Sequence, residues 1–278
     1  MPLGLEYASG FPDRIARLLI GPSGGTGREF KSPLMGKFKV SLTNGSKPNK
    51  AEFKVYNLGY DTVNFLERSG NTVQFFVGEG SSGRLFKGDI SSRGILTTVD
   101  PPNRITTIKC ADGRRIWRST RFVKSYSPGI TRSAVLQDLI AASGLPLGYL
   151  SPKLKELIFA TGWAHAGKWR SAMTKILAID GARYSIQQGS LYIVAAGEAE
   201  PGNAPLITPR TGLKKSPTRT KKGVSIETVL DPRIRPGRAL QLISTGVTGD
   251  FKCVKADHSG DFRGIEWTTK AEAVPLRR

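Results

Sequence analysis

Alternation of apolar and polar residues is the dominant pattern of this chain, and it is clearest near the C-terminus. Over residues 262–274 one face of the alternation carries Ile265, Trp267, Thr269 and Ala271. A period of two residues is typical of a half-buried β-strand. Two further strand-like segments, residues 231–244 and 250–261, precede it and are bounded by Pro, Gly and Ser residues that favour turns. These segments predict an antiparallel sheet or small barrel within residues 212–274.

A second set of alternating segments lies in the first 115 residues. KFKVSL (37–42) and AEFKVYNL (51–58) each alternate, and further strands are expected in TVQFFVG, RLFKGDI and RITTIKCADG. A short helix is expected between Asp61, as its N-cap, and Gly70, as its stop. The short apolar run 15–20 is followed by GPSGGTG (21–27), which lacks the Gly-Lys-Ser/Thr ending of a phosphate loop. We interpret GPSGGTG as a linker.

The pattern changes to a helical period in the middle of the chain. Thr131 is expected to cap a helix that stops at Gly144, and a second helix is expected to stop at Gly181. The second helix has an apolar stripe at i, i+3, i+4, i+7 and i+8, formed by Trp169, Ala172, Met173, Ile176 and Leu177. A hairpin is expected around Gln188 and Gly189. Together these elements predict an α/β insertion.

The Pro-rich stretch that follows carries a local excess of positive charge. Its basic residues are Arg210, Lys214, Lys215, Arg219, Lys221 and Lys222. It is either a solvated connector or a contact for an acidic neighbour. The expected organisation is an N-terminal β-barrel domain (1–115), an α/β insertion (116–197), a basic linker or loop (198–223) and a C-terminal β-barrel domain (224–278). The expected fold class is α+β and mainly β.

The net charge of +20 suggests an acidic partner, either a protein or a nucleic acid. A dedicated nucleic-acid-binding arm would concentrate the basic residues, whereas here they are spread over the whole chain. Specific nucleic-acid binding is therefore kept only as the alternative hypothesis. No stretch approaches eighteen uninterrupted apolar residues, so no membrane insertion is expected. The N-terminus lacks the basic-then-apolar order of a signal peptide, and we expect synthesis in a cytoplasm without export by that route.

Candidate chemistry is sparse. His165 has no carboxylate at helical spacing, and His258 is followed by Ser259 and Asp261 in a turn too tight to converge on one substrate atom. Two cysteines, Cys110 and Cys253, are expected as buried free thiols, although one disulfide is possible. No ligand spacing supports a metal site. We therefore expect no catalytic, cofactor or metal site, with a cell-wall hydrolase kept as a further alternative.

Several motifs occur in an order that resembles the hub proteins of phage tail baseplates, in the late-control-D and contractile-tail hub families. In the C-terminal part these are L-D-P-x-I-R-P-G (230–237) and F-K-C-V-K-A-D-H-S-G-D-F-R-G-x-E-W-T-T (251–269). In the N-terminal part they are Y-N-L (56–58), V-x-F-x-V-G (73–78) and L-F-K-G-D-I (85–90). The resemblance covers roughly residues 34–275.

This resemblance implies a structural subunit in the tail baseplate of a virion, assembled in the host cytoplasm. It implies a homotrimer in which each chain presents two tube-like β-barrel domains, so that six similar surfaces join a hexameric tail tube to a trimeric spike. Because the sequence ends AVPLRR without a fused spike segment, a separate spike protein is expected. Other baseplate proteins are expected partners, and DNA passes only in transit. The six basic residues above and Trp267 are the interface candidates.

Overall fold

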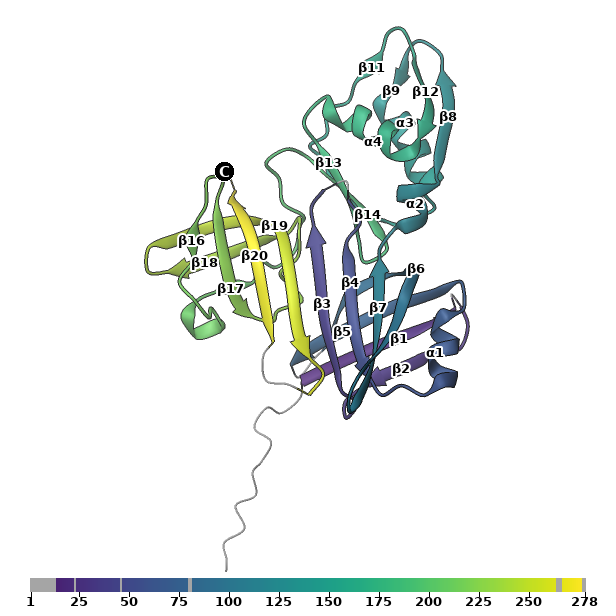
Figure 1. The fold of residues 1–278 in the computed structure, drawn as a ribbon. Coiled ribbons are helices and arrows are strands. Elements are labelled where there is room, and N and C mark those ends of the chain that lie inside the picture. Colours follow the sequence, from purple (N-terminus) through teal and green to yellow (C-terminus); the bar gives the residue numbers. More distant parts are fainter. Residues whose placement is uncertain (1–13, 23, 46, 80–81, 264–266, 277–278) are drawn as a thin grey trace, which may run out of the picture.

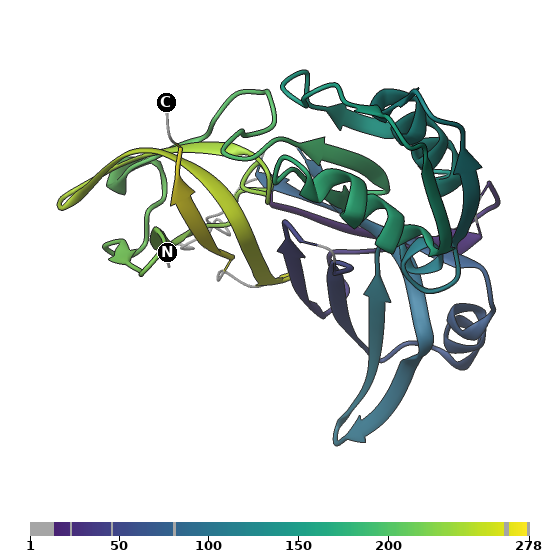
Figure 2. The ribbon, with the colours of Figure 1, turned by 90° about the horizontal axis from the view of Figure 1, so that it is seen from above.

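The computed structural model describes residues 14–276, apart from residues 23, 46, 80–81 and 264–266. The described chain is mainly β, with four short α-helices gathered largely in its middle part (Figure 1). Two β modules lie next to each other, and the helix-rich middle domain lies beyond one end of the N-terminal module (Figures 1 and 2). The prediction of a mainly β chain is confirmed.

The N-terminal module consists of seven strands and one helix. Their bounds are β1 (Arg14–Pro22), β2 (Arg28–Lys31), β3 (Gly36–Thr43), β4 (Lys50–Tyr56), α1 (Tyr60–Glu67), β5 (Asn71–Glu79), β6 (Gly83–Asp100) and β7 (Asn103–Ala111). The strands pair antiparallel in the order β3-β4-β7-β6-β5-β1-β2. Alternate residues point inward, as Phe38, Val40 and Leu42 do on β3, which buries a continuous apolar core under the sheet.

The C-terminal module is smaller. Its elements are β15 (Leu206–Ile207), η1 (Pro209–Thr211), β16 (Thr218–Arg219), β17 (Val224–Val229), β18 (Ala239–Ser244), β19 (Val247–Asp261) and β20 (Thr268–Pro275). Strands β16, β17, β20 and β19 follow one another in the sheet, and β18 pairs with the first part of β19. The alternation expected for the last strand is confirmed from Thr268 onward, whereas Ile265 and Glu266 lie outside the described residues.

Strand β19 joins the two modules into one sheet. The second half of this fifteen-residue strand pairs with β20 on one side and with β3 on the other. The strand order therefore runs from β16 to β2 without returning on itself, and the described residues form an open sheet rather than two closed barrels. The sequence pattern predicts the strands but does not predict that β19 pairs with strands of both modules. The pairing on both edges of β19 is made by backbone groups, which every residue carries.

The middle domain carries α2 to α4 and several short strands. Its elements are α2 (Arg114–Arg118), β8 (Arg121–Tyr126), β9 (Ile130–Thr131), α3 (Arg132–Ser143), β10 (Leu147–Leu150), β11 (Ile158–Phe159), β12 (Trp163–Lys168), α4 (Trp169–Ala178), β13 (Arg183–Gln187) and β14 (Ser190–Val194). Thr131 caps α3 through its side chain, and Gly144 ends α3 in the left-handed conformation, as predicted. The predicted apolar stripe of α4 is buried, and the hairpin around Gln188 and Gly189 is confirmed.

Two local predictions are wrong. The segment expected to be a linker connects β1 and β2, which pair with each other as a hairpin. β1 also pairs along its whole length with β5. Gly27 allows the close approach of the two strands, since a Cβ there would lie 2.9 Å from the Ile20 carbonyl oxygen. In α1 the N-cap is Gly59 rather than Asp61, which lies in the first turn.

Candidate functional site

The segment expected as a linker, residues 198–223, folds onto the C-terminal module. β15 pairs with β18, and β16 pairs with β17. Between these short strands Thr208 and Thr211 form a reciprocal capping box around η1. The segment is therefore held by backbone pairing and side-chain caps, and it forms an outer border of the module.

All six basic candidates of this segment are exposed, and three of them contact the module. Lys215 forms an ion pair with Glu227 at 3.2 Å, Lys214 donates to the Thr268 hydroxyl, and Arg219 donates to the Gly246 carbonyl. The remaining three candidates are Arg210, Lys221 and Lys222. The exposed pair with Glu227 contributes little to stability because water screens it. This border is a basic surface rather than a preformed catalytic site.

Trp267, the seventh candidate, is buried. Its indole packs edge-on against Phe38 at 5.8 Å between ring centroids, and its Nε1 donates to the Asp261 carbonyl at 2.8 Å. Gly260 makes room for it, since a Cβ there would lie 2.6 Å from the indole Cδ1. Trp267 thus belongs to the core that the N-terminal module shares with the C-terminal module. Its side chain therefore contacts other parts of the same chain and is not exposed to solvent.

The two histidines occupy interior positions. His258 is fully buried on β19, where its Nδ1 lies 2.9 Å from the Thr269 hydroxyl. Burial lowers the pKa of His258 to about 4, so the imidazole is neutral at pH 7. His165 is also buried and stacks on Trp163 at 6.0 Å between ring centroids. Neither ring is presented to a substrate.

The cysteines and acidic residues give no sign of chemistry either. Cys110 and Cys253 are both free and buried, as the sequence favours. Burial raises the pKa of both thiols, that of Cys253 to about 12, which keeps them protonated and unreactive. Among the described residues no group of three or more His, Cys, Asp or Glu could hold a metal ion. No described helix is long and apolar enough to cross a membrane.

A buried polar node fixes the middle domain to the N-terminal module. The Asn49 side-chain amide donates to the Asp112 carboxylate at 2.7 Å and to the Gln187 side-chain oxygen at 2.9 Å. Gln187 in turn donates to the Thr43 carbonyl at 3.0 Å. Burial raises the pKa of Asp112 to about 7, although the hydrogen bonds from Asn49 oppose the shift. The β13–β14 hairpin is thereby attached to the ends of β3 and β4.

A second buried contact fixes the same hairpin to the C-terminal module. Arg235 forms an ion pair with Glu200 at 3.0 Å, and both side chains are almost fully buried. The Arg235 guanidinium also lies over the Tyr192 ring of β14, 5.1 Å from its centroid. Gly237 is required beside this pair, because a Cβ there would lie 2.2 Å from a Glu200 carboxylate oxygen. The middle domain is therefore held at two separate points.

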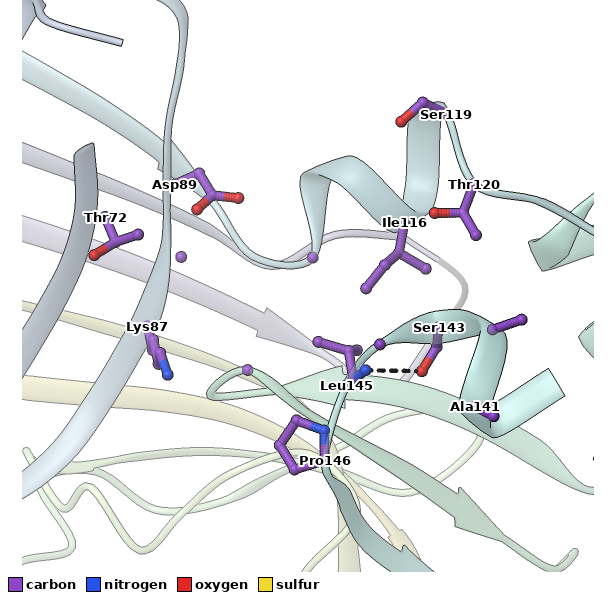
Figure 3. Close-up of a pocket in the computed structure, with 15 residues that line it drawn as sticks. Thr72, Lys87, Asp89, Ile116, Ser119, Thr120, Ala141, Ser143, Leu145 and Pro146 are labelled. Atoms are coloured by element: carbon purple, nitrogen blue, oxygen red, sulfur yellow. Dashed lines mark hydrogen bonds between the residues drawn. The ribbon is translucent and has the colours of Figure 1, made fainter. Parts of the chain in front are cut away.

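A cleft of about 630 Å³ lies between the middle domain and the N-terminal module (Figure 3). Lys87 and Asp89 of β6 line one side, and the end of α3 lines another, where Ser143 accepts a hydrogen bond from the Leu145 amide at 3.0 Å. One cation, one carboxylate and several hydroxyls line this cleft.

Comparison with known proteins places the fold. No protein-family model and no curated protein matches the chain. Solved structures do match it. The tail protein from Neisseria meningitidis MC58 aligns with a TM-score of 0.61 and 11% identity over 94% of this chain and 96% of that chain. The 43 kDa tail protein of prophage MuSo2 from Shewanella oneidensis aligns with a TM-score of 0.60 and 9% identity, over 95% and 99% of the two chains.

A component of the type VI secretion system of E. coli is also similar, with a TM-score of 0.57 and 10% identity over 93% of this chain and 77% of that chain. At such low identity these likenesses establish the fold. They extend over nearly the whole chain, including the middle domain and both β modules. The resemblance to phage tail proteins found in the sequence is thus confirmed at the level of the fold.

Proposed function

We propose that the chain is a structural subunit of the hub at the base of a phage tail, and that it acts by assembly rather than by catalysis. The observation that carries this proposal is the fold shared with phage tail proteins over more than nine-tenths of the chain. The buried histidines and protonated thiols agree with a role without chemistry. The chain is then a component of the virion tail, assembled in the host cytoplasm.

The proposed hub is a homotrimer in which each chain contributes two tube-like β domains. Three chains then present six similar surfaces, which match a hexameric tail tube on one side and a trimeric spike on the other. The fusion of both β modules through β19 supports this arrangement, because it fixes the two modules of one chain at a constant angle and spacing. Other baseplate proteins contact the outside, and DNA passes through the central channel in transit.

The proposed domains are residues 1–115, 116–197 and 224–278, with the basic segment 198–223 at the border of the last. Three apolar clusters support this division, with the difference that the first also contains Leu230, Phe262 and Trp267 of the C-terminal part. The exposed basic residues of the border, Arg210 to Lys222, are the proposed contact with an acidic tube, spike or baseplate protein. Trp267 takes no direct part in that contact, since it is buried within the chain.

The decisive measurement is the molar mass of the purified protein by light scattering, alone and with the tail tube protein of the same phage. The trimer predicts three times the mass of the 30.1 kDa chain and a larger species when tube protein is added. Negative-stain images of that species should show rings. A monomer that ignores the tube protein contradicts the hub. A cell-wall zymogram and a gel shift with DNA test the two alternatives, and both should be negative.

A further inference from the structure

A hollow of about 430 Å³ lies where all three parts of the chain meet. The loop after β3 contributes Asn44, the middle domain contributes the start of β13 and the end of β14, and the C-terminal module contributes β19 and the last residues of β20. A site at this junction contacts every module at once.

The charge of this hollow has one sign. Three cations line it, Arg183 from β13, Lys222 from the turn before β17 and Lys252 from β19, and its lining contains no Asp or Glu. Arg183 and Lys222 are exposed, and the structure as described gives neither side chain a hydrogen bond or an ion pair. Unlike Lys215, which is paired with Glu227, these two cations have no ion pair among the residues that the structure describes.

The third cation is partly buried. Lys252 donates from its Nζ to the Glu198 carbonyl oxygen. Burial lowers the pKa of Lys252 and the neighbouring Arg183 lowers it further, while Glu200 and Glu198 oppose the shift. The Glu198 carboxylate itself is occupied, because Tyr149 and Ser151 both donate to it. Lys252 is therefore partly compensated by these two glutamates, and the cations of the hollow that have no ion pair among the described residues are Arg183 and Lys222.

The backbone fixes the positions of these cations. Residues 220–223 form a tight turn, in which Thr220 and Gly223 exchange backbone hydrogen bonds of 2.8 and 3.4 Å. Gly223 lies against β20 so closely that a Cβ would be 2.0 Å from the Ala273 carbonyl oxygen. On the other side, Gly181 in the left-handed conformation ends the turn after α4 and leads into β13. Lys222 and Arg183 are thus placed by rigid turns.

The walls between the cations are apolar. Val254, Val274 and Pro275 are partly or fully exposed to the hollow's surroundings, and the remaining lining is largely Ala, Gly and Leu. A nucleic-acid backbone is recognised along an extended basic surface. A concave site with a few cations and apolar walls instead fits a short peptide, whose carboxylates pair with the cations while an apolar side chain covers the walls.

We propose that this hollow, defined by Arg183, Lys222 and Lys252, is the docking site for an acidic peptide segment of a neighbouring tail protein. That the partner is a tail protein rests on the proposed function, whereas binding of an acidic peptide does not. The segment carries at least two carboxylates beside an apolar side chain. Its binding adds to the contact that Arg235 and Glu200 already make between the middle domain and the C-terminal module.

The test is fluorescence anisotropy with the whole chain and a fluorescein-labelled peptide, Glu-Glu-Leu-Glu-Glu-Val. The double variant Arg183→Glu with Lys222→Glu should bind this peptide about tenfold more weakly than the unmodified chain. The matched control is Lys54→Glu with Lys175→Glu, which makes the same change of net charge at exposed sites outside the hollow. The control variant should bind the acidic peptide as tightly as the unmodified chain does. A neutral peptide with Gln in place of each Glu should not bind to the unmodified chain.

Three results overturn the proposal. They are an equal loss in both double variants, an unchanged affinity in the hollow variant, and preferential binding of a single-stranded 12-nucleotide DNA that the hollow variant loses. Thermal unfolding followed by circular dichroism should show that each variant retains its fold, because all four substituted side chains are exposed. Light scattering separates this inference from the hub: a monomer that binds the peptide contradicts only the hub, and a trimer that ignores it contradicts only the docking site.

Discussion

The two β modules differ in what fills their cores. The N-terminal core is large and aromatic, and Phe75 packs tilted against Phe38 and edge-on against Phe53, with ring centroids 4.8 and 4.9 Å apart. The C-terminal core is small and rich in short side chains, including Cys253, Ala256, Ala271 and Ala273. Two aromatic residues of the C-terminal part, Phe262 and Trp267, pack into the N-terminal core, whereas Phe251 belongs to the C-terminal core. The C-terminal module is therefore stabilised by its neighbour as much as by its own interior.

Truncation of Trp267 tests this dependence most directly. Trp267→Ala should lower the free energy of unfolding by about 3–5 kcal/mol, because it removes a buried indole on the Phe38 side of the shared core. The measurement is urea unfolding followed by far-UV circular dichroism. If this variant does not fold, Trp267→Phe should give a smaller loss in the same direction.

The matched control for this experiment is Leu96→Ala, at a side chain that is 57% exposed on β6. It should change the free energy of unfolding by less than about 0.5 kcal/mol. A Trp267→Ala variant as stable as this control would show that the C-terminal module does not depend on the shared core.

Enlarging a side chain in the C-terminal core has a smaller expected effect. Ala256 on β19 is fully buried among other short side chains, so Ala256→Leu should cost about 1–3 kcal/mol through overpacking. Thermal unfolding is the readout. Ala256→Gly is the comparison in the opposite direction. A stabilised Ala256→Leu variant would mean that the C-terminal core has unfilled space and that its small residues are not closely packed.

Two buried groups, His258 on β19 and Asp112 in the polar node, should contribute to the pH dependence of stability with opposite signs. The pKa of His258 is about 4 in the folded chain and near 6.5 when unfolded, so acidification from pH 6.5 to 4 protonates the unfolded state first and destabilises the fold. The pKa of Asp112 is raised to about 7, so its contribution is greatest at low pH and is lost as the pH rises from 3.8 to 7.

Single variants separate these opposite contributions. His258→Gln should remove the part of the free energy of unfolding that is lost on acidification, and Asp112→Asn should remove the part that is gained. Each substitution should change the slope of the free energy of unfolding against pH by up to about 1.4 kcal/mol per pH unit. Urea unfolding at pH 4.5, 5.5 and 6.5 measures both slopes. Slopes identical to that of the unmodified chain would contradict the assignment of these groups.

The smallest effect is expected at the basic border. Lys215→Ala removes an exposed ion pair with Glu227 and should change stability by less than about 1 kcal/mol, with the difference vanishing at high salt. Differential scanning calorimetry at low and high salt measures it. A larger loss that persists in salt would show that the border is part of the C-terminal core rather than its rim.

Local patterns were sufficient to predict most of the N-terminal strands and both main helices of the middle domain. Thr131 and Gly144 identify the ends of α3 because capping depends on neighbouring residues alone. Strand β1 was missed because Ile15 and Leu19 are also apolar, which hides the alternation of its buried residues, Ala16, Leu18 and Ile20. β15 and β16 have two residues each, too few for a period to be visible.

Features formed by distant segments could not be predicted in this way. The pairing of β19 with β3 joins residues more than two hundred positions apart, and no spacing in the sequence indicates it. The basic hollow is similar, because Arg183, Lys222 and Lys252 come from three different segments. Trp267 was predicted to be an interface residue, but only the fold shows that it packs one module of the chain against the other.

The in-register ladder between β19 and β3 also determines how the chain carries mechanical load. Seven residue pairs, from Lys255 with Thr43 to Asp261 with Lys37, connect the modules. A pull along the strand axis strains all these backbone hydrogen bonds together, whereas a pull across the sheet opens them one after another. The seam is therefore strongest against sliding and weakest against peeling, and the direction of an applied force decides whether the two modules stay together.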